Sequence, residues 1–403
     1  MAGPAPRGEQ LVKNLILAGM LTLSLMGIAA LAFQKSNKKP TPRPSPAAGT
    51  RATPKPAVSP PRGSTTLKPS PSPNGTPISF LSSVFAIQTL VFLLAAGLVA
   101  FGIGLSIGQV TLHETGSVAL WRATEAAILA VLGGLLARAF IAFLLSSAKD
   151  PSGAQIAVGW GFFIIPGAVD SFAKLFTGDL VTTPAFLLWM AMIIGAFTGM
   201  MNGLWQIHDW KGMGWLAFPL DVTWGLAGAT TGTLMHLIDA IATKHATEIR
   251  EDAHRYEGGM RLKPTFALTQ GAVMSNLKEG PSSPGQSHDT LYYHERTHVW
   301  QNRIFGPLFT LASLVWMGLL SIPAAIGAIV LKNVRTFESL CYYNSPWETW
   351  AYLVGAGPRT GRTDDAGRPI PWIWGNLAVL GVSIPFFLGI ISLFVWIVSR
   401  VWL

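Results

Sequence analysis

The chain has 403 residues, 50% of them hydrophobic and only 12% charged. Soluble domains carry about 25% charged residues, because polar groups must cover their surface. The composition therefore excludes an ordinary soluble enzyme, and the high apolar content excludes a disordered protein. It predicts an integral membrane protein made mainly of α-helices, whose first partner is the lipid bilayer.

The formal net charge of +9 does not by itself predict a nucleic-acid partner. Most of the 29 lysines and arginines lie between apolar segments, where anionic lipid headgroups and the charge bias of cytoplasmic loops account for them. We therefore expect no nucleic-acid binding. The single cysteine, Cys341, excludes an intramolecular disulfide and a zinc site built from cysteines.

The N-terminal part divides into an apolar and a proline-rich segment. The uncharged run Leu15–Phe33 predicts an uncleaved transmembrane signal anchor over residues 1–34. The small residues Ala30-Leu31-Ala32 favour the alternative of a cleaved signal peptide. Residues 35–78 hold 12 of the 28 prolines and eight lysines or arginines, which predicts a disordered tether. The tether is either a plain spacer or a docking arm for a partner.

Residues 79–242 are predicted to form a multi-helix transmembrane block. A helix needs about 20 mostly apolar residues to cross the bilayer core. The candidate segments are Val84–Gly108, Ala123–Ser147, Ala154–Phe172, Pro184–Ile207 and Met213–Ile241. Pro166 and Asp170 interrupt the third segment, so we expect a half-helix or a re-entrant piece there. Gly195, Gly199 and Gly203 recur every four residues, which indicates a smooth helix face for close packing.

Charged residues inside this block need partners. Glu125 and Arg138 lie 13 residues apart on one predicted helix, so each is expected to face another helix, a cavity or the interface. Asp170, Asp221 and Asp239 raise the same question. An ion or proton path, and with it a transport role, is an alternative interpretation of these acids.

Residues 243–371 are more polar and are predicted to contain a metal site. The alternation over Arg261–Leu268 is typical of a strand, and Gln270–Met274 could pair with it as a hairpin. An apolar stretch, Ile304–Leu331, follows within this region. Residues 372–403 are predicted to form a C-terminal transmembrane helix.

The most informative motif is His294-Glu295-Arg296-Thr297-His298. Positions i and i+4 share one face of a helix, so both imidazoles can bind one metal ion, with Glu295 beside them as a general base. A catalytic zinc ion needs a third protein ligand. Glu348 is the best candidate, and Glu338 and His288 are the alternatives.

These residues resemble the gluzincin branch of zinc metallopeptidases. The resemblance rests on His294-Glu295-x-x-His298 with Gln301, on Gly306-Pro307-Leu308, and on Pro346-x-Glu348-x-Trp350-Ala351, and it covers residues 260–355. More narrowly, the pattern is similar to that of poorly characterised bacterial polytopic membrane proteins.

The resemblance implies a small zincin-like α+β element at the membrane surface. It implies Zn²⁺ bound by His294, His298 and Glu348, with Glu295 as the general base. Many gluzincins carry Asp one turn after the third ligand, where this chain has Tyr352.

A shared metal ion constrains the topology. If residues 304–331 crossed the bilayer, His298 and Glu348 would emerge on opposite faces. Pro323 divides this stretch, so we expect a re-entrant hairpin over 304–331. The basic residues of the flanking polar stretches favour the cytoplasmic face. The basic tether favours the same face, which requires an even number of crossings between the tether and the site.

The sequence therefore favours a membrane-embedded zinc metallopeptidase that hydrolyses membrane-associated polypeptides, located in the bacterial inner membrane. The alternative is a non-catalytic structural or assembly subunit of a membrane complex, with a vestigial or structural metal site. Four tyrosines close to the predicted ligands in sequence could stabilise developing charge or belong to an interfacial aromatic belt. They are Tyr292, Tyr293, Tyr342 and Tyr343.

Overall fold

The structure is a computed structural model, and it describes most of the chain after residue 78. The described residues are 79–246, 250–261, 266–277, 287–332, 337, 339–343, 345–355 and 375–403. The predicted signal anchor and tether, and the alternative ligand Glu338, lie outside them. Because its side chain is not described, the same holds for His288 as a ligand.

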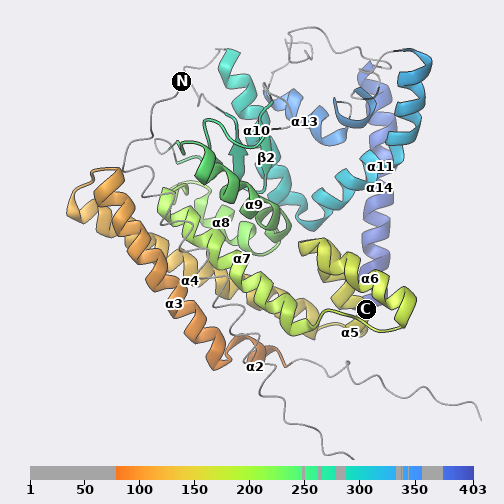
Figure 1. Ribbon diagram of the computed structural model, residues 1–403. Coiled ribbons are helices and arrows are strands. Elements are labelled where there is room, and N and C mark those ends of the chain that lie inside the picture. Colours follow the sequence, from red (N-terminus) through yellow and green to blue (C-terminus); the bar gives the residue numbers. More distant parts are fainter. Residues whose placement is uncertain are drawn as a thin grey trace, which may run out of the picture.

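The described part of the chain is mainly helical, with one small sheet (Figure 1). Five of its helical stretches are long and apolar enough to cross a membrane, as the composition predicted. They are Phe80–Thr111, Gly116–Ser146, Pro184–Trp205, Pro307–Val330 and Ser383–Val401. This arrangement is consistent with a multi-pass membrane protein.

Three long helices form the centre of the N-terminal block: α3 (Ile87–Ser106), α4 (Gly116–Ser146) and α7 (Pro184–Trp205). The short helix α2 (Phe80–Val84) precedes α3, and a π-helical turn (Ile107–Thr111) follows it. A side chain at Gly199 would overlap the carbonyl oxygen of Leu129, and one at Gly203 would overlap the backbone of Ala126. The glycine spacing of α7 therefore permits its close contact with α4, as predicted.

The third apolar segment forms a helical hairpin. Its arms are α5 (Pro151–Val158) and α6 (Ile165–Thr177), joined through a π-helical turn (Gly159–Phe163). Ile164 has a positive φ of 61°, which breaks the helix, and a side chain at Gly167 would collide with the backbone of Trp160. The arms are short and pack together, so the expectation of a re-entrant piece agrees with the fold.

The fifth predicted segment also folds as two short helices, α8 (Gly214–Val222) and α9 (Leu226–Ala242). Neither reaches the length of the candidate spans. The described block therefore has three long apolar helices before residue 206.

The polar region contributes a three-stranded sheet with strand order β1-β3-β2. The strands are β1 (His254–Arg255), β2 (Leu268–Gln270) and β3 (Val273–Ser275). Strands β2 and β3 pair antiparallel, with Thr269 opposite Met274. The turn between them uses Gly271 at φ 58°, pressed against the backbone of Gly228. A hairpin therefore forms here, but its strands are shifted from the predicted ones: Gln270, predicted in the second strand, ends the first, and residues 262–265 lie outside the described residues.

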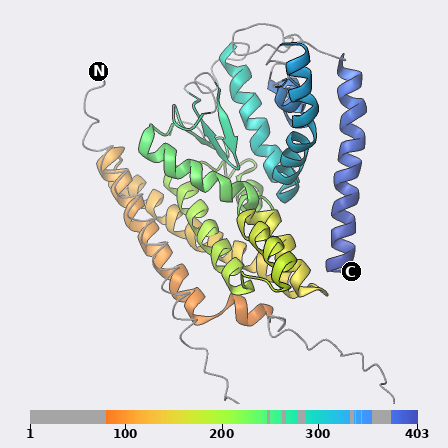
Figure 2. The same ribbon diagram turned by 45° about the vertical axis from the view of Figure 1, so that its right-hand side comes forward.

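The metal-motif helix and the following apolar helix form a V. Helix α10 (Ser287–Phe305) and helix α11 (Pro307–Val330) meet at Gly306, and their other ends open toward the same end of the molecule (Figure 2). Gly306 has a φ of 51°, and a side chain there would collide with Trp224. Only glycine adopts this conformation without strain in so little space.

The hairpin predicted within residues 304–331 is wrong in position. Helix α11 continues through Pro323. An apolar helix can contain proline where neighbouring groups or local adjustments satisfy the backbone group that proline leaves unpaired. The turn lies instead at Gly306. The chain then returns between the arms of the V through a π-helical turn (Ser339–Tyr343) and α13 (Pro346–Gly355) (Figure 1). Helix α14 (Gly375–Val401) runs outside the V (Figure 2).

The charged residues of the helical block have fixed partners from other elements. Glu125 accepts hydrogen bonds from Gln206 and Trp210, and Arg138 donates one to the carbonyl oxygen of Ser83. The three aspartates accept from Val181 and Thr182 (Asp170), from Arg303 (Asp221) and from the backbone of Met260 (Asp239). Each of these charged groups therefore has at least one partner, while Nη1 of Arg138 and Oδ2 of Asp239 have no hydrogen bond among the described residues.

Candidate metal centre

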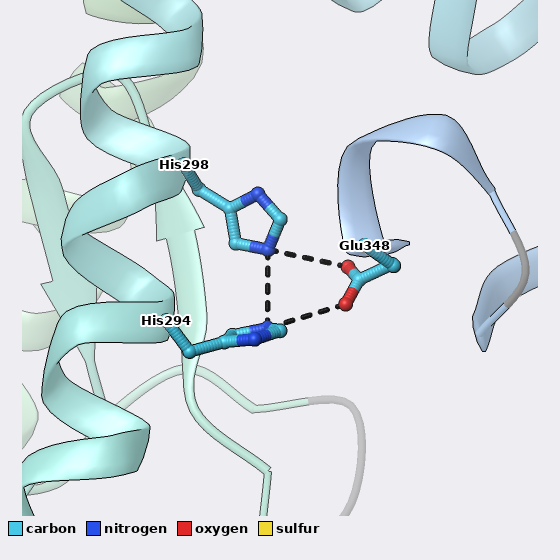
Figure 3. A group of neighbouring side chains, drawn as sticks. All are labelled: His294, His298 and Glu348. Carbon is cyan, nitrogen blue, oxygen red and sulfur yellow. Dashed lines mark hydrogen bonds and ion pairs between the residues drawn. The ribbon is translucent and has the colours of Figure 1, made fainter. Parts of the chain in front are cut away.

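Helix α10 and the first turn of α13 bring the three predicted ligands together (Figure 3). The Nε2 atoms of His294 and His298 lie 3.2 Å apart. The carboxylate of Glu348 faces both of them, with Oε2 3.2 Å from His294 Nε2 and Oε1 3.3 Å from His298 Nε2. All three residues are buried, and they form the one such histidine and carboxylate group found among the described residues.

Gln301 determines the orientation of His298. Its side-chain oxygen is 2.8 Å from Nδ1 of His298, and its Nε2 donates to the carbonyl oxygen of Trp347 at 3.0 Å. Since that oxygen can only accept, His298 must carry its proton on Nδ1. The lone pair of His298 Nε2 is then directed toward His294 and Glu348. Gln301 also links α10 to the residue that precedes Glu348.

A cation is needed between these groups. An unprotonated Nε2 and a carboxylate oxygen are both acceptors, so a distance of 3.3 Å between them is repulsive unless a proton or a metal ion lies there. Burial alone lowers the pKa of His298, but the nearby carboxylates of Glu348 and Glu295 outweigh it and raise this pKa to about 9. Burial raises the pKa of Glu348, whereas the two histidines reverse that effect and leave it well below the usual range.

The donor set fits zinc. Two imidazole nitrogens and one carboxylate oxygen from three residues, with a further position open, are the ligands of many catalytic zinc sites. The hydrogen bond of His298 to Gln301 supplies the outer partner that metal-binding histidines usually have. The buried ring of His294 contacts the ring of Tyr352, at 4.4 Å between centroids. Tyr352 thus stands beside a ligand where many gluzincins have a carboxylate.

Glu295 lies on the same helix, next to the ligands, and is buried. Its carboxylate oxygen Oε2 accepts a hydrogen bond of 2.6 Å from the hydroxyl of Thr269 on β2. Sequence patterns gave no signal for Thr269, because it belongs to another element 26 residues earlier. Glu295 also lines a cavity of about 220 Å³ together with His298 and Glu348.

An apolar helix and the outer strand of the sheet both line the cavity. Helix α11 contributes Phe309, Leu314 and Met317, and the outer strand β2 contributes Leu268 to Gln270. Of the four candidate tyrosines, Tyr342 lines the cavity. Burial raises the pKa of Tyr342, and the carboxylates of Glu348 and Glu295 raise it further, so its hydroxyl stays protonated beside them.

Replacing Gln301 with leucine is expected to lower zinc affinity about ten- to a hundredfold, since the variant loses the partner that fixes the His298 ring. Competition with a chromogenic chelator would measure the affinity in detergent-solubilised protein. Gln155→Leu is the matched control, because Gln155 is also buried but bonds Asp170 and Thr182. Equal affinity in the wild type and the Gln301 variant would contradict the role of Gln301.

A second group of histidines lies buried in another part of the fold. His245 donates to His254, His254 donates to Asn202, Asn202 donates to His208, and His208 donates to Asp252, over distances of 2.9–3.4 Å. The amide of Asn202 fixes the direction of every bond, because its oxygen accepts and its nitrogen donates. This chain joins α7 to the sheet. Sequence patterns gave no signal for it.

Acid should destabilise the fold through these buried histidines. Burial lowers the pKa of His236 to about 3 and lowers the pKa values of His245 and His254 well below 6.5. Unfolding therefore takes up protons below pH 6.5, so stability is lost as the pH falls. The shifted pKa of His236 alone should lower the free energy of unfolding by about 2 kcal/mol at pH 5. His298 does not change this trend, because its raised pKa makes its contribution constant below pH 6.5.

Thermal unfolding between pH 6.5 and pH 5, where the contribution of His298 is constant, would measure this effect. His236→Gln is expected to reduce the loss of melting temperature on acidification, whereas the exposed His113, changed to glutamine, should leave it unaltered. The same acid slope in all three proteins would show that the buried histidines are not its source.

Comparisons of the sequence and the structure with known proteins found no significant match. No protein-family model matches the chain, and neither a curated protein nor a solved structure is significantly similar to it. The geometry of the site is therefore the basis for any functional assignment.

Proposed function

We propose that this protein is a membrane-embedded, zinc-dependent metallopeptidase that hydrolyses peptide bonds of membrane-associated polypeptides. The observation that carries the proposal is the convergence of His294, His298 and Glu348, together with Glu295, which lines one cavity with His298 and Glu348. Zinc held by the three ligands would supply a Lewis acid for water and for the scissile carbonyl group.

The residues of the chain have separate roles in this reaction. Glu295 accepts one proton from the attacking water, whose oxygen bonds to the carbonyl carbon. When the C–N bond breaks, the leaving nitrogen takes up that proton, so Glu295 returns to its carboxylate form. The products are a carboxylic acid and an amine. Tyr342 lines the same cavity, and its hydroxyl would donate to negative charge that develops on the carbonyl oxygen.

The walls of the cavity favour a polypeptide substrate in extended form. Strand β2 is at the edge of the sheet, and an added strand can pair with such an edge. The opposite wall comes from the first half of α11, an apolar helix whose side chains are mostly not buried by the rest of the protein. A substrate segment from the membrane can therefore approach the site beside α11. The resemblance to bacterial membrane proteins supports a bacterial inner-membrane location.

The test is Glu295→Gln in detergent-purified full-length protein, with zinc content and cleavage of dye-quenched β-casein as readouts. The variant is expected to keep its zinc and to lose at least about a hundredfold in rate, because a general base contributes that much or more. Glu257→Gln is the control, since Glu257 is exposed and pairs with Lys244. Unchanged cleavage by Glu295→Gln would exclude the proposed mechanism.

A non-catalytic assembly subunit is the second candidate. The observation that favours it is His294, whose buried Nδ1 has no hydrogen-bond partner among the described residues, with Tyr352 rather than a carboxylate beside the ring. A metal ion bound by a histidine without an outer hydrogen-bond partner suits a structural rather than a catalytic role. Purification with stoichiometric partner proteins, and without cleavage products, would support this candidate.

A further inference from the structure

Thr269 connects the outer strand of the sheet to the proposed general base. It is the central residue of β2, and its side chain faces α10 and is buried. Its hydroxyl oxygen lies 2.6 Å from Oε2 of Glu295 and 3.5 Å from the backbone oxygen of the same residue. A hydroxyl has one proton to donate, and the shorter distance assigns it to the carboxylate.

This bond makes the two oxygens of Glu295 different. Oε2 is occupied by the Thr269 hydroxyl, which is a charge-assisted bond of the stronger kind. Oε1 is therefore the oxygen that can take a proton from a water molecule in the cavity. A buried carboxylate without such a partner could rotate about its terminal torsion, whose energy wells are broad.

We propose that Thr269 is a positioning residue that fixes the Glu295 carboxylate for proton transfer. This inference rests on the proposed peptidase function, in which Glu295 is the base. Threonine suits the position because its β-branched side chain has restricted rotamers in a strand, so the hydroxyl stays directed at α10. The pairing of Thr269 with Met274 in β3 fixes the backbone from which the hydroxyl projects.

The experiment compares Thr269→Val and Thr269→Ser in the full-length, zinc-loaded protein. Valine keeps the shape and removes the donor, whereas serine keeps the donor. The control is Thr233→Val, because the Thr233 hydroxyl donates to the backbone oxygen of Ala229, in a helix away from the site, and not to a carboxylate. The readouts are zinc content, KM and kcat for dye-quenched β-casein, and the infrared carboxylate band that Glu295→Gln removes.

We expect Thr269→Val to keep its zinc and its KM, to lose about ten- to a hundredfold in kcat, and to shift the Glu295 band. Thr269→Ser should restore both kcat and the band, and Thr233→Val should change neither. A wild-type kcat in Thr269→Val, while Glu295→Gln is inactive, would show that Thr269 only holds the strand in place. Wild-type protein no faster than Glu295→Gln would instead overturn the proposed function, and this inference with it.

Discussion

Replacing Glu348 with alanine is expected to lower zinc affinity on the order of a thousandfold, because structural zinc binding of about 10–16 kcal/mol is divided among only a few ligands. Glu348 is the one ligand of the three that does not lie on α10, so its loss leaves two nitrogens of one helix. The loss should exceed that of Gln301→Leu, since Gln301 acts on the metal only through His298.

Elemental mass spectrometry and chelator competition on detergent-purified protein would measure this loss. Glu257→Ala is the matched control, because it removes an exposed carboxylate that pairs with Lys244 at 3.6 Å. Wild-type zinc content in Glu348→Ala would mean that another residue is the third ligand. Metal-free wild-type protein, prepared without chelator, would show that the group binds a proton rather than a metal ion.

Replacing Arg303 with leucine is expected to destabilise the protein by about 3–5 kcal/mol, because the change leaves a buried carboxylate without its partner. Arg303 is only 1% exposed. Its Nε and one terminal nitrogen donate to the two carboxylate oxygens of Asp221, and both distances are 2.8 Å. It also donates to the backbone oxygen of Asp252. One side chain thus joins the metal-motif helix to α8 and to the segment before β1.

A double-variant cycle would measure the contribution of this pair by denaturant unfolding in detergent. Arg303→Leu combined with Asp221→Leu should recover part of the loss, since two apolar residues leave no uncompensated charge. Lys244→Ala is the surface control and should cost less than about 1 kcal/mol. Equal destabilisation by Arg303→Leu and Lys244→Ala would contradict the role of the buried pair.

Local residue patterns were sufficient to predict the parts of the fold that depend on neighbours in sequence. The apolar runs predicted the long helices, and the four-residue glycine spacing of α7 predicted its close packing. The alternation before Gln270 predicted a hairpin in this region, although the turn at Gly271 shifts its strands. Pro166 and Asp170 correctly marked the segment that folds as a short helical hairpin. Each of these signals acts within a few residues.

The sequence pattern does not predict the turn at Gly306, because proline ordinarily breaks a helix more strongly than glycine. Pro323 lies inside α11, whereas Gly306 adopts a conformation that the close approach of Trp224 makes necessary. The split of residues 213–241 into α8 and α9 was missed for a related reason. Their apolar composition is continuous, and only the packing of the turn shows the break.

The sequence by itself determined that the chain is mainly helical, with helices apolar enough to cross a membrane, and that His294 and His298 share one helix face. Composition and helical period are local properties. Glu348 was a prediction of chemistry, and the tertiary structure decided that it reaches the histidines, because α13 returns between the arms of the V. The tertiary structure alone showed three further contacts. Thr269 donates a hydrogen bond to Glu295, Gln301 bonds both His298 and Trp347, and Arg303 donates to Asp221. Such contacts depend on how separate elements pack, and no local pattern encodes them.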